Sequence, residues 1–258
     1  MPTDSVATPA DHLLAAELAT ETGQLLLAVR AELEGADAAD LKAEGDRRAH
    51  QLLMTRLAER APGDAILSEE GTAEEGRSGT GRLAAARVWI VDPLDGTREF
   101  SEPPRADWAV HVALVIGGVP VAGAVALPAQ NITLGTSPAA PMPPDPPARP
   151  RVIVSRTRPP AIALAVAEAL GAELVEMGSA GAKVAAVVLG AADVYPHAGG
   201  QYEWDSAAPV AVATAAGLHA SRLDGSPLRY NNADPYLPDL LVCHPSLLDA
   251  VLRVTGPG

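Results

Sequence analysis

The stretch "WIVDPLDGTREF", residues 89–100, decides how the rest of the chain is interpreted. An apolar run over 88–91, typical of a strand, leads directly into Asp92 and Asp95, and Gly96 and Thr97 follow at once. Asp and Gly are common turn residues, so a simple turn is one interpretation. A functional site at the end of a strand is the other, and the remaining sequence has to decide between them.

Composition favours an ordinary globular protein. The 258 residues suffice for one large domain or for two closely packed halves. Hydrophobic residues make up 48% of the chain and aromatic residues only 3%, so Ala, Val and Leu must fill the core. The formal net charge of −13 argues against nucleic acid or an anionic membrane surface as a partner.

Three further features bear on the compartment. Cys243 is the single cysteine, is expected to be buried, and allows no disulfide within the chain, which fits a reducing cytoplasm. The opening residues 1–14 lack the basic region and apolar core of a secretory signal, so a cytoplasmic location is expected. Residues 109–129 are apolar for about the length of a membrane span, but Gly117 and Gly118 interrupt them. A buried hairpin joined at these glycines is the better prediction.

Hydrophobic periodicity predicts an α+β first half over residues 1–136. Helices are expected over 10–34 and 46–60, and strands over 65–67, 88–91, the hairpin 109–129 and 132–136. Residues 137–150 hold seven prolines and are predicted to form an extended connection on the surface.

In the second half, residues 151–258, strands and helices alternate, which indicates an α/β arrangement. Strands are expected over 151–155, 172–177, 192–196 and 240–244, and helices over 159–170, 182–189, 205–216 and the C-terminal residues.

Acidic side chains gather where strands are expected to end. Hard oxygen ligands of this kind suit Mg²⁺, and a pair of such ions makes an acidic site attractive to anions. Asp92 could bridge two ions, and Asp95 and the carbonyl of Leu94 could supply further oxygens. No His/Cys spacing suggests zinc.

A phosphate fits the same stretch. The turn at Gly96 and Thr97, opening onto a short helix, presents free backbone N–H groups to an anion. Carboxylates for metal followed by a phosphate cradle indicate metal-assisted phosphoryl hydrolysis.

Three motifs carry a family resemblance over nearly the whole chain. "SEE" (68–70), "DPLDGT" (92–97) and "WDSAA" (204–208) occur in the order and spacing of the inositol monophosphatase superfamily of lithium-sensitive, magnesium-dependent phosphomonoesterases. The resemblance implies a layered αβαβα sandwich. Further segments, "VSRTRPP", "GSAGAK", "YPHAGGQYEWD" and "LDGSPLRYN", look most like the bacterial 3′-phosphoadenosine 5′-phosphate phosphatases (CysQ type), particularly those of actinobacteria.

The resemblance implies metal ligands residue by residue. Glu69, Asp92 and the Leu94 carbonyl would hold a first metal ion, which carries the attacking water. Asp92, Asp95 and Asp205 would hold a second, which stabilises the leaving oxygen. Two or three Mg²⁺ ions per site are expected. Because clustered like charges repel, removing the charge of Asp95 is expected to stabilise the metal-free protein.

Activation of the water is assigned in the same way. Thr97, oriented by Asp46, would help Glu69 to activate it. An alternative for Asp46 is that it caps the helix expected to begin there. Glu70 is expected to be solvated or to lie behind the ligands.

Substrate contacts are implied in both halves of the chain. The expected set is Glu69, Leu94, Asp95, Gly96, Thr97, Ser155, Arg156, Ser179, Lys183, His197 and Asp205. Inositol monophosphatases usually carry an acidic residue seven positions before the last motif Asp, and this chain has Ala198 there. Ser155 and Arg156 match a Ser-Arg pair of the nucleotide phosphatases. Lys183 would be a cation for a second anionic group or, alternatively, a solvated helix residue.

Hydrolysis of the 3′-phosphate of 3′-phosphoadenosine 5′-phosphate to AMP, in sulfur assimilation, is the leading functional hypothesis. Alternatives are hydrolysis of inositol-1-phosphate or fructose-1,6-bisphosphate, and a catalytically silent nucleotide or metal sensor. The sensor is disfavoured because no motif carboxylate is missing. The superfamily also suggests a homodimer.

Overall fold

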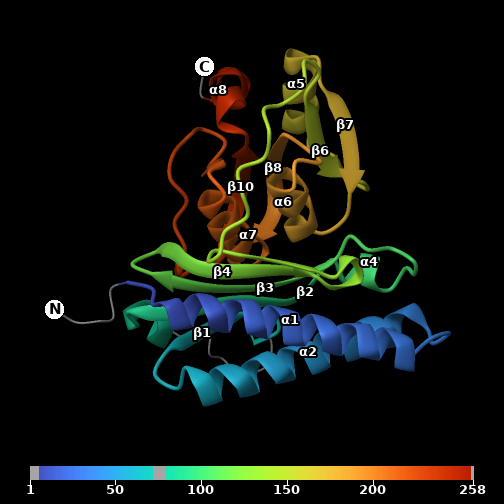
Figure 1. The fold of residues 1–258 in the computed structure, drawn as a ribbon, viewed down its shortest axis with the longest axis vertical. Coiled ribbons are helices and arrows are strands. Elements are labelled where there is room, and N and C mark those ends of the chain that lie inside the picture. The colour runs from blue at the N-terminus through green and yellow to red at the C-terminus, as the bar shows by residue number, and fades with distance from the viewer. Residues whose placement is uncertain (1–5, 72–79, 257–258) are drawn as a thin grey trace.

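Two stacked sheets with helices between and outside them make up the fold (Figure 1). The computed structural model describes residues 6–71 and 80–256, and residues 1–5 of the N-terminal stretch considered above lie outside them. Within the described residues each sheet has five strands, in the orders β1-β2-β3-β4-β5 and β7-β6-β8-β10-β9. The elements of the first half are α1 (Pro9–Glu32), α2 (Ala38–Arg60), β1 (Ala65–Ser68), η2 (Thr80–Ala84), β2 (Arg87–Asp95), α4 (Thr97–Phe100), β3 (Ala109–Ile116), β4 (Val119–Leu127), η3 (Pro128–Gln130) and β5 (Ile132–Gly135).

The second sheet follows a mostly exposed connection over 137–150, which contains no helix. Strands β7, β6 and β8 are parallel, and β10 is antiparallel to both β8 and β9. The elements are β6 (Arg151–Ser155), α5 (Ala161–Leu170), β7 (Glu173–Met177), α6 (Ala180–Val188), β8 (Val194–Tyr202), α7 (Glu203–Ala215), β9 (His219–Ser221), β10 (Tyr236–Cys243), η4 (Pro245–Leu247) and α8 (Leu248–Thr255).

Three apolar clusters hold five layers together. The first joins α1 and α2 to one face of the first sheet, and the second joins the opposite face to α6, α7 and the second sheet. The third packs α5 and α8 on the outer face of the second sheet. Figure 1 shows this order of layers from bottom to top. The expected αβαβα sandwich is confirmed, and helices α6 and α7 lie in its middle layer.

An extra residue in β2 sets the direction of its last side chain. Asp92 pairs with His111 of β3, and Asp95 pairs with Ala109. The two pairs are therefore three residues apart along β2 but only two residues apart along β3. Regular alternation would point Asp92 and Asp95 to opposite faces of the sheet. With the extra residue, Leu94 packs in the cluster of α1 and α2, and both carboxylates can face the middle layer. The expectation that the strand stops at residue 91 is therefore wrong.

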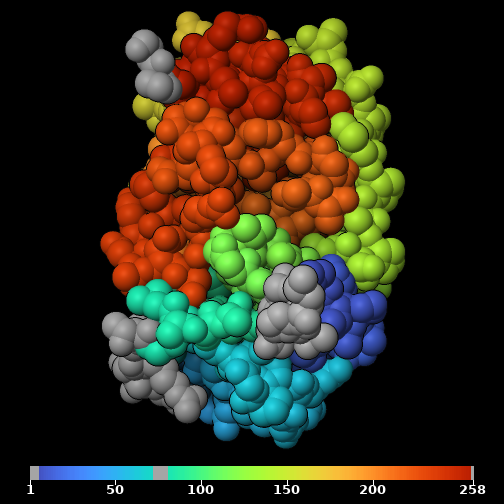
Figure 2. Space-filling view, turned by 90° about the vertical axis from the view of Figure 1, so that its left-hand side faces the viewer, coloured from blue at the N-terminus to red at the C-terminus, as the bar shows by residue number. Residues whose placement is uncertain are grey.

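Contacts away from these aspartates also join the two halves. In the turn between β3 and β4, the Gly118 carbonyl accepts a hydrogen bond of 3.1 Å from Tyr230 N. Arg82 of η2 donates to Asn231 Oδ1 at 2.6 Å. Figure 2 shows these segments, coloured green, teal and orange-red, packed against one another on one face of the molecule.

Several element boundaries differ from those expected. Helix α2 begins at Ala38, with Asp37 accepting from Ala39 N as its cap, so the interpretation of Asp46 as a cap is wrong. The helix continues through Gly45, where an added Cβ would lie only 2.8 Å from Phe100, so the glycine allows the close approach. Strand β9 was not expected.

The segment that resembled a membrane span is the hairpin of β3 and β4, as predicted. Among the helices of the described residues, none combines the length and the apolar character needed to cross a membrane. Cys243 is fully buried, also as predicted.

A pair of leucines on α1 tests the packing of the lowest layer. Leu18 is fully buried between α1 and the sheet, whereas Leu13 is 55% exposed. Leu18→Ala is expected to lower the free energy of unfolding by about 2–5 kcal/mol. Leu13→Ala should change it by no more than about 0.5 kcal/mol. Urea unfolding of both variants measures the difference, and similar losses would contradict this packing.

Candidate active site

Three aspartates from different parts of the chain meet between the two sheets. Asp92 and Asp95 come from the end of β2, and Asp205 lies in the first turn of α7. Each offers a carboxylate oxygen, and these atoms all lie within 4.8 Å of one another. The Tyr202 N–H donates to Asp205 Oδ2 at 2.6 Å, which fixes that carboxylate at the start of its helix.

Asp95 is the most tightly held of the three. Its carboxylate accepts hydrogen bonds from Ser179 Oγ at 2.5 Å and from the backbone N–H groups of Gly181 and Ala180 at 2.6 and 3.2 Å. These donors form the N-terminal end of α6, where the helix dipole also favours a negative charge. A carboxylate of the first sheet is thus bound by the second half of the chain.

The three aspartate carboxylates lie in different electrostatic environments. Burial, with repulsion from neighbouring carboxylates, raises the pKa of Asp92 well above its ordinary value and that of Asp205 to about 7. Burial alone would also raise the pKa of Asp95, but the nearby His111 ring and the bond from Ser179 hold it at about 2. The ionised form of Asp95 is therefore favoured in the fold. This argues against the expectation that removing its charge stabilises the metal-free protein, which stays a prediction.

Glu69, Thr97 and Asp46 lie beside this cluster. Glu69 follows β1, whose Ser68 pairs with Val91, and it shares a hydrogen bond with Asp92. Although Glu69 is an exposed residue, desolvation of its carboxyl group raises its pKa to about 7.

The middle of α2 brings Asp46 to Thr97. Burial raises the pKa of Asp46 to about 7, Glu70 adds to the rise, and a hydrogen bond with Thr97 opposes it. A hollow beside them is lined by Asp46, His50, Met54 and Glu70 among others.

The turn between the aspartates and α4 is tightly packed. Gly96 has φ of +85°, and an added Cβ would lie 2.9 Å from Ser179 Cβ, so only glycine fits. Leu94 N donates to Asp92 Oδ1 at 3.1 Å, and the Leu94 carbonyl accepts from Thr97 Oγ1 at 3.2 Å. Helix α4 is a single turn, Thr97–Phe100. The phosphate cradle at Gly96 and Thr97 stays a prediction.

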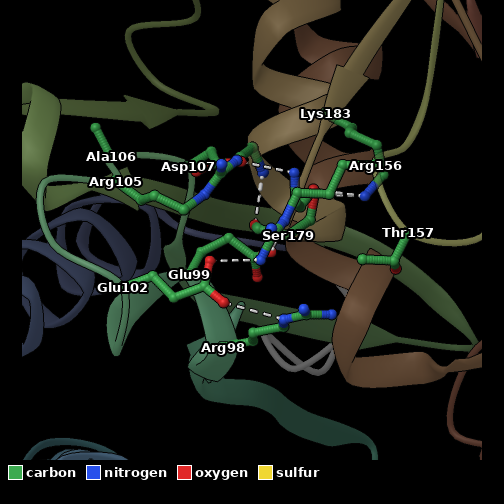
Figure 3. Close-up of polar contacts among 12 residues, drawn as sticks. Arg98, Glu99, Glu102, Arg105, Ala106, Asp107, Arg156, Thr157, Ser179 and Lys183 are labelled. Carbon is green, nitrogen blue, oxygen red and sulfur yellow. Dashed lines mark hydrogen bonds and ion pairs between the residues drawn. The ribbon is translucent and has the colours of Figure 1, made fainter. Parts of the chain in front are cut away.

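Arg156 connects the two halves beside the site. It donates to Glu99 Oε1 at 2.6 Å and to Glu102 Oε2 at 2.8 Å, both in or just after α4 (Figure 3). Glu99 is buried, and an added Cβ at Gly178 would lie only 2.2 Å from its side chain. The expected substrate cation thus has carboxylate partners within the chain.

Lys183 is neither solvated nor open to the surface. Its side chain is 5% exposed, so the alternative of a solvated helix residue is wrong. The ammonium group donates to the carbonyls of Gly178 and Ser179 at 2.6 and 2.8 Å and lies 5.4 Å from the centre of the Tyr195 ring. A substrate contact by Lys183 stays a prediction.

The remaining expected contacts lie on β6 and β8. Ser155 ends β6, and its hydroxyl accepts from the N–H groups of Thr157 and Arg158, each at 3.4 Å. His197 of β8 lies 2.8 Å from the Gly199 carbonyl, and burial lowers its pKa to about 4. A largely neutral imidazole at pH 7 is therefore expected there.

The sequence analysis missed His111. Its ring is fully buried beneath the aspartates, with Nε2 3.3 Å from Asp95 Oδ2 and Nδ1 3.0 Å from the Trp204 carbonyl. An added Cβ at Gly181 would lie 1.9 Å from Nε2, so α6 can pass over the ring only with glycine there. The sequence pattern that could have indicated it is a single histidine in the apolar run of β3. His111 pairs with Asp92 and therefore lies on the same face of the sheet.

The donor set fits a divalent metal ion. Three carboxylates from β2 and α7 lie close together, and burial, with their mutual repulsion, raises the pKa values of Asp92 and Asp205. A cation would relieve both effects. Oxygen ligands of this kind are those that Mg²⁺, Mn²⁺ and Ca²⁺ prefer.

Comparisons with known proteins show which proteins the chain is similar to. The chain is 51% identical over 248 residues to the 3′-phosphoadenosine 5′-phosphate phosphatase of Mycobacterium tuberculosis, covering 90% of this chain and 89% of the relative. It is 32% identical over 204 residues to the 3′(2′),5′-bisphosphate nucleotidase CysQ of Escherichia coli K12, covering 74% and 80%.

Solved structures share the fold. CysQ from Bacteroides thetaiotaomicron superposes with a TM-score of 0.77 at 27% identity, covering 91% of this chain and 97% of that one. Inositol monophosphatase II from Staphylococcus aureus superposes with a TM-score of 0.78 at 20% identity, covering 96% of each. Residues 6–139 and 151–254 match the inositol monophosphatase family. The resemblance seen in the motifs is confirmed, and the chain belongs to the inositol monophosphatase family.

Proposed function

We propose that this protein is a magnesium-dependent phosphatase that converts 3′-phosphoadenosine 5′-phosphate to AMP and phosphate. The meeting of Asp92, Asp95 and Asp205 within 4.8 Å carries the proposal, because it provides a metal site in a chain of this family. The names of the mycobacterial relatives at 50 and 51% identity support the nucleotide substrate. Inositol-1-phosphate and fructose-1,6-bisphosphate are the competing substrates.

The reaction is the attack of water on phosphorus, with cleavage of the bond to the ribose 3′ oxygen. Asp92, Asp95 and Asp205, together with Glu69, would hold the metal ions. Bound there, Mg²⁺ supplies positive charge to the phosphate and lowers the pKa of water.

Thr97 and Asp46 provide a path for the proton of that water. The Thr97 hydroxyl contacts both the Leu94 carbonyl and Asp46, and its one proton would have to turn from the carbonyl to Asp46 for the path to operate. The pKa of Asp46, about 7, allows it to accept a proton at neutral pH. Glu69, also with a pKa of about 7, is the second base candidate on the same side of the cluster.

Selection of a bisphosphate would depend on the second half of the chain. Arg156 reaches the site from the end of β6, and a second phosphate could replace Glu102 as its partner. Ala198 offers no carboxylate for sugar hydroxyls. Gly199 and Gly200 have open space around their Cα atoms, which leaves room for a larger group near His197.

Turnover tests the proposal directly. Purified protein with Mg²⁺ is expected to release phosphate from 3′-phosphoadenosine 5′-phosphate faster than from inositol-1-phosphate, and lithium should inhibit the release. Thr97→Ala should lower kcat by about 10²–10⁴-fold with a smaller effect on KM, whereas Thr97→Ser, which keeps the hydroxyl, should retain most activity. Full activity in EDTA, or faster hydrolysis of the inositol phosphate, would refute the assignment.

Metal removal should make stability depend on pH, because burial and mutual repulsion disfavour the charged carboxylates. Asp46, Glu69 and Asp205 have pKa values raised to about 7, so each favours the fold while protonated. That contribution is complete below pH 4 and is lost as the pH rises through 7. The melting temperature of metal-free protein should therefore fall between pH 5 and pH 8, and Mg²⁺ should restore it.

Two Asp→Asn variants show which carboxylate is responsible for the loss of stability. At pH 8 without metal, Asp205→Asn should melt above the wild type, because it removes a charge whose pKa is raised. Asp95→Asn should melt below it, because the ionised Asp95 carboxylate is stabilised by its donors. Differential scanning calorimetry measures both, and the opposite order would contradict the assigned environments.

Arg156 should discriminate between substrates. Arg156→Ala is expected to raise KM for the bisphosphate by at least about 10-fold, the loss of one charged hydrogen bond, and to affect a simple monophosphate much less. Arg253→Ala, which removes an exposed arginine of α8, serves as the control for net charge. Equal losses of Arg156→Ala on both substrates would show that the residue does not recognise the second phosphate.

A further inference from the structure

Ser179 has a backbone conformation that residues with a side chain rarely adopt. Its φ is +27° and its ψ is 133°, at the cap of α6. Positive φ brings Cβ close to the backbone, so it costs free energy in any residue other than glycine. Such a conformation persists where surrounding contacts hold it, and it is common at functional sites.

The ammonium group of Lys183 holds both peptide groups that flank Ser179. It donates to the Gly178 carbonyl at 2.6 Å, before the Ser179 Cα, and to the Ser179 carbonyl at 2.8 Å, after it. The orientations of these two peptide groups determine φ and ψ of Ser179. One buried cation therefore fixes both torsions.

The conformation of Ser179 aims three donors at one carboxylate. The Ser179 hydroxyl and the N–H groups of Gly181 and Ala180 all donate to Asp95. We propose that Lys183 is a positioning residue, which holds the strained turn at Ser179 so that α6 orients the Asp95 carboxylate. The inference rests on the proposed function only where it treats Asp95 as a metal ligand.

Asp107 acts on the same turn from the first half of the chain. Its carboxylate accepts from Gly178 N at 2.7 Å and is paired with Arg105 (Figure 3). Asp107 therefore holds the peptide group between Met177 and Gly178 at its N–H, and Lys183 holds the next one, between Gly178 and Ser179, at its carbonyl. Figure 3 shows Lys183, Ser179 and Asp107 gathered at this turn.

A role of Lys183 as a phosphate ligand agrees less well with these contacts. Its side chain is 5% exposed, two of its three N–H donors face carbonyls, and Tyr195 covers it at 5.4 Å. These contacts leave one N–H for a substrate phosphate, which could accept more than one hydrogen bond from Lys183 only by replacing a carbonyl and thereby releasing the turn that holds Asp95.

Lys183→Met tests the positioning role, because methionine keeps the length of the side chain and removes its donors. Mn²⁺ is titrated into metal-free protein by calorimetry, and amide hydrogen exchange of Ala180 and Gly181 is measured without metal. We expect Lys183→Met to raise the dissociation constant for Mn²⁺ by about 10–100-fold, as for other residues that orient metal ligands. Exchange at the two amides should accelerate by at least about 10-fold. Arg253→Met is the control for the lost charge.

Three results would overturn the inference. The first is unchanged Mn²⁺ affinity and exchange with a raised KM for the bisphosphate, which would make Lys183 a substrate ligand. The second is a lower melting temperature with unchanged exchange at Ala180 and Gly181. The third is absence of any change. If the wild type binds no Mn²⁺, the proposed function fails, while the exchange measurement on metal-free protein still tests Lys183.

Two substitutions at Ser179 test the strain if Lys183→Met does not fold. Ser179→Gly and Ser179→Ala both lose the hydroxyl bond to Asp95, but glycine adopts positive φ without a steric cost. Ser179→Gly should therefore melt at a higher temperature than Ser179→Ala. An equal or reversed order would show that no strain is held at this turn, and the inference would fail.

Discussion

The carboxylate cluster depends on the hydrogen bonds between Asp95 and the start of α6. They join a carboxylate on the first sheet to backbone donors of the second half. If the two halves moved apart, Asp95 would lose these donors and Asp205 would leave the cluster. The packing of α6 and α7 in the middle layer is thus a condition for the chemistry as well as for stability.

Gathering carboxylates in a buried place costs free energy, and the chain limits that cost unevenly. The His111 ring, the Ser179 hydroxyl and the start of α6 stabilise the charge of Asp95, whereas Asp92 and Asp205 have raised pKa values and less such compensation. A positive charge near Asp92 and Asp205 would therefore stabilise the cluster more than one near Asp95 would. A bound cation would then couple metal concentration to folding stability, because it binds the folded chain in preference to the unfolded one.

The sequence predicted the layers and the carboxylates well because both leave local patterns. Periodicity located the helices and strands, and motif spacing located Asp92, Asp95 and Asp205. Residues that become neighbours only through tertiary contacts leave no such local pattern in the sequence. Lys183 was expected near an anion, yet it donates to two carbonyls. Glu203 is buried and accepts hydrogen bonds from the N–H groups of Asn231 and Asn232, which nothing in the local sequence indicates. The cap of α2 was misplaced because Asp46 and Asp37 look alike as capping residues, and only packing against Phe100 shows that the helix passes through Gly45.

The additional residue in β2 also limits how the chain can vary in length. Deleting Leu94 would restore regular pairing with β3 and keep both carboxylates on one face, but it would remove a side chain that packs in the apolar layer of α1 and α2 and the carbonyl that accepts from Thr97 Oγ1. The turn at 117–118 has no such requirement, since an added Cβ at Gly117 would meet nothing within 4 Å. Insertions and deletions among natural relatives should therefore be found at the hairpin turn and in residues 137–150, while the four-residue segment from Asp92 to Asp95 keeps its length.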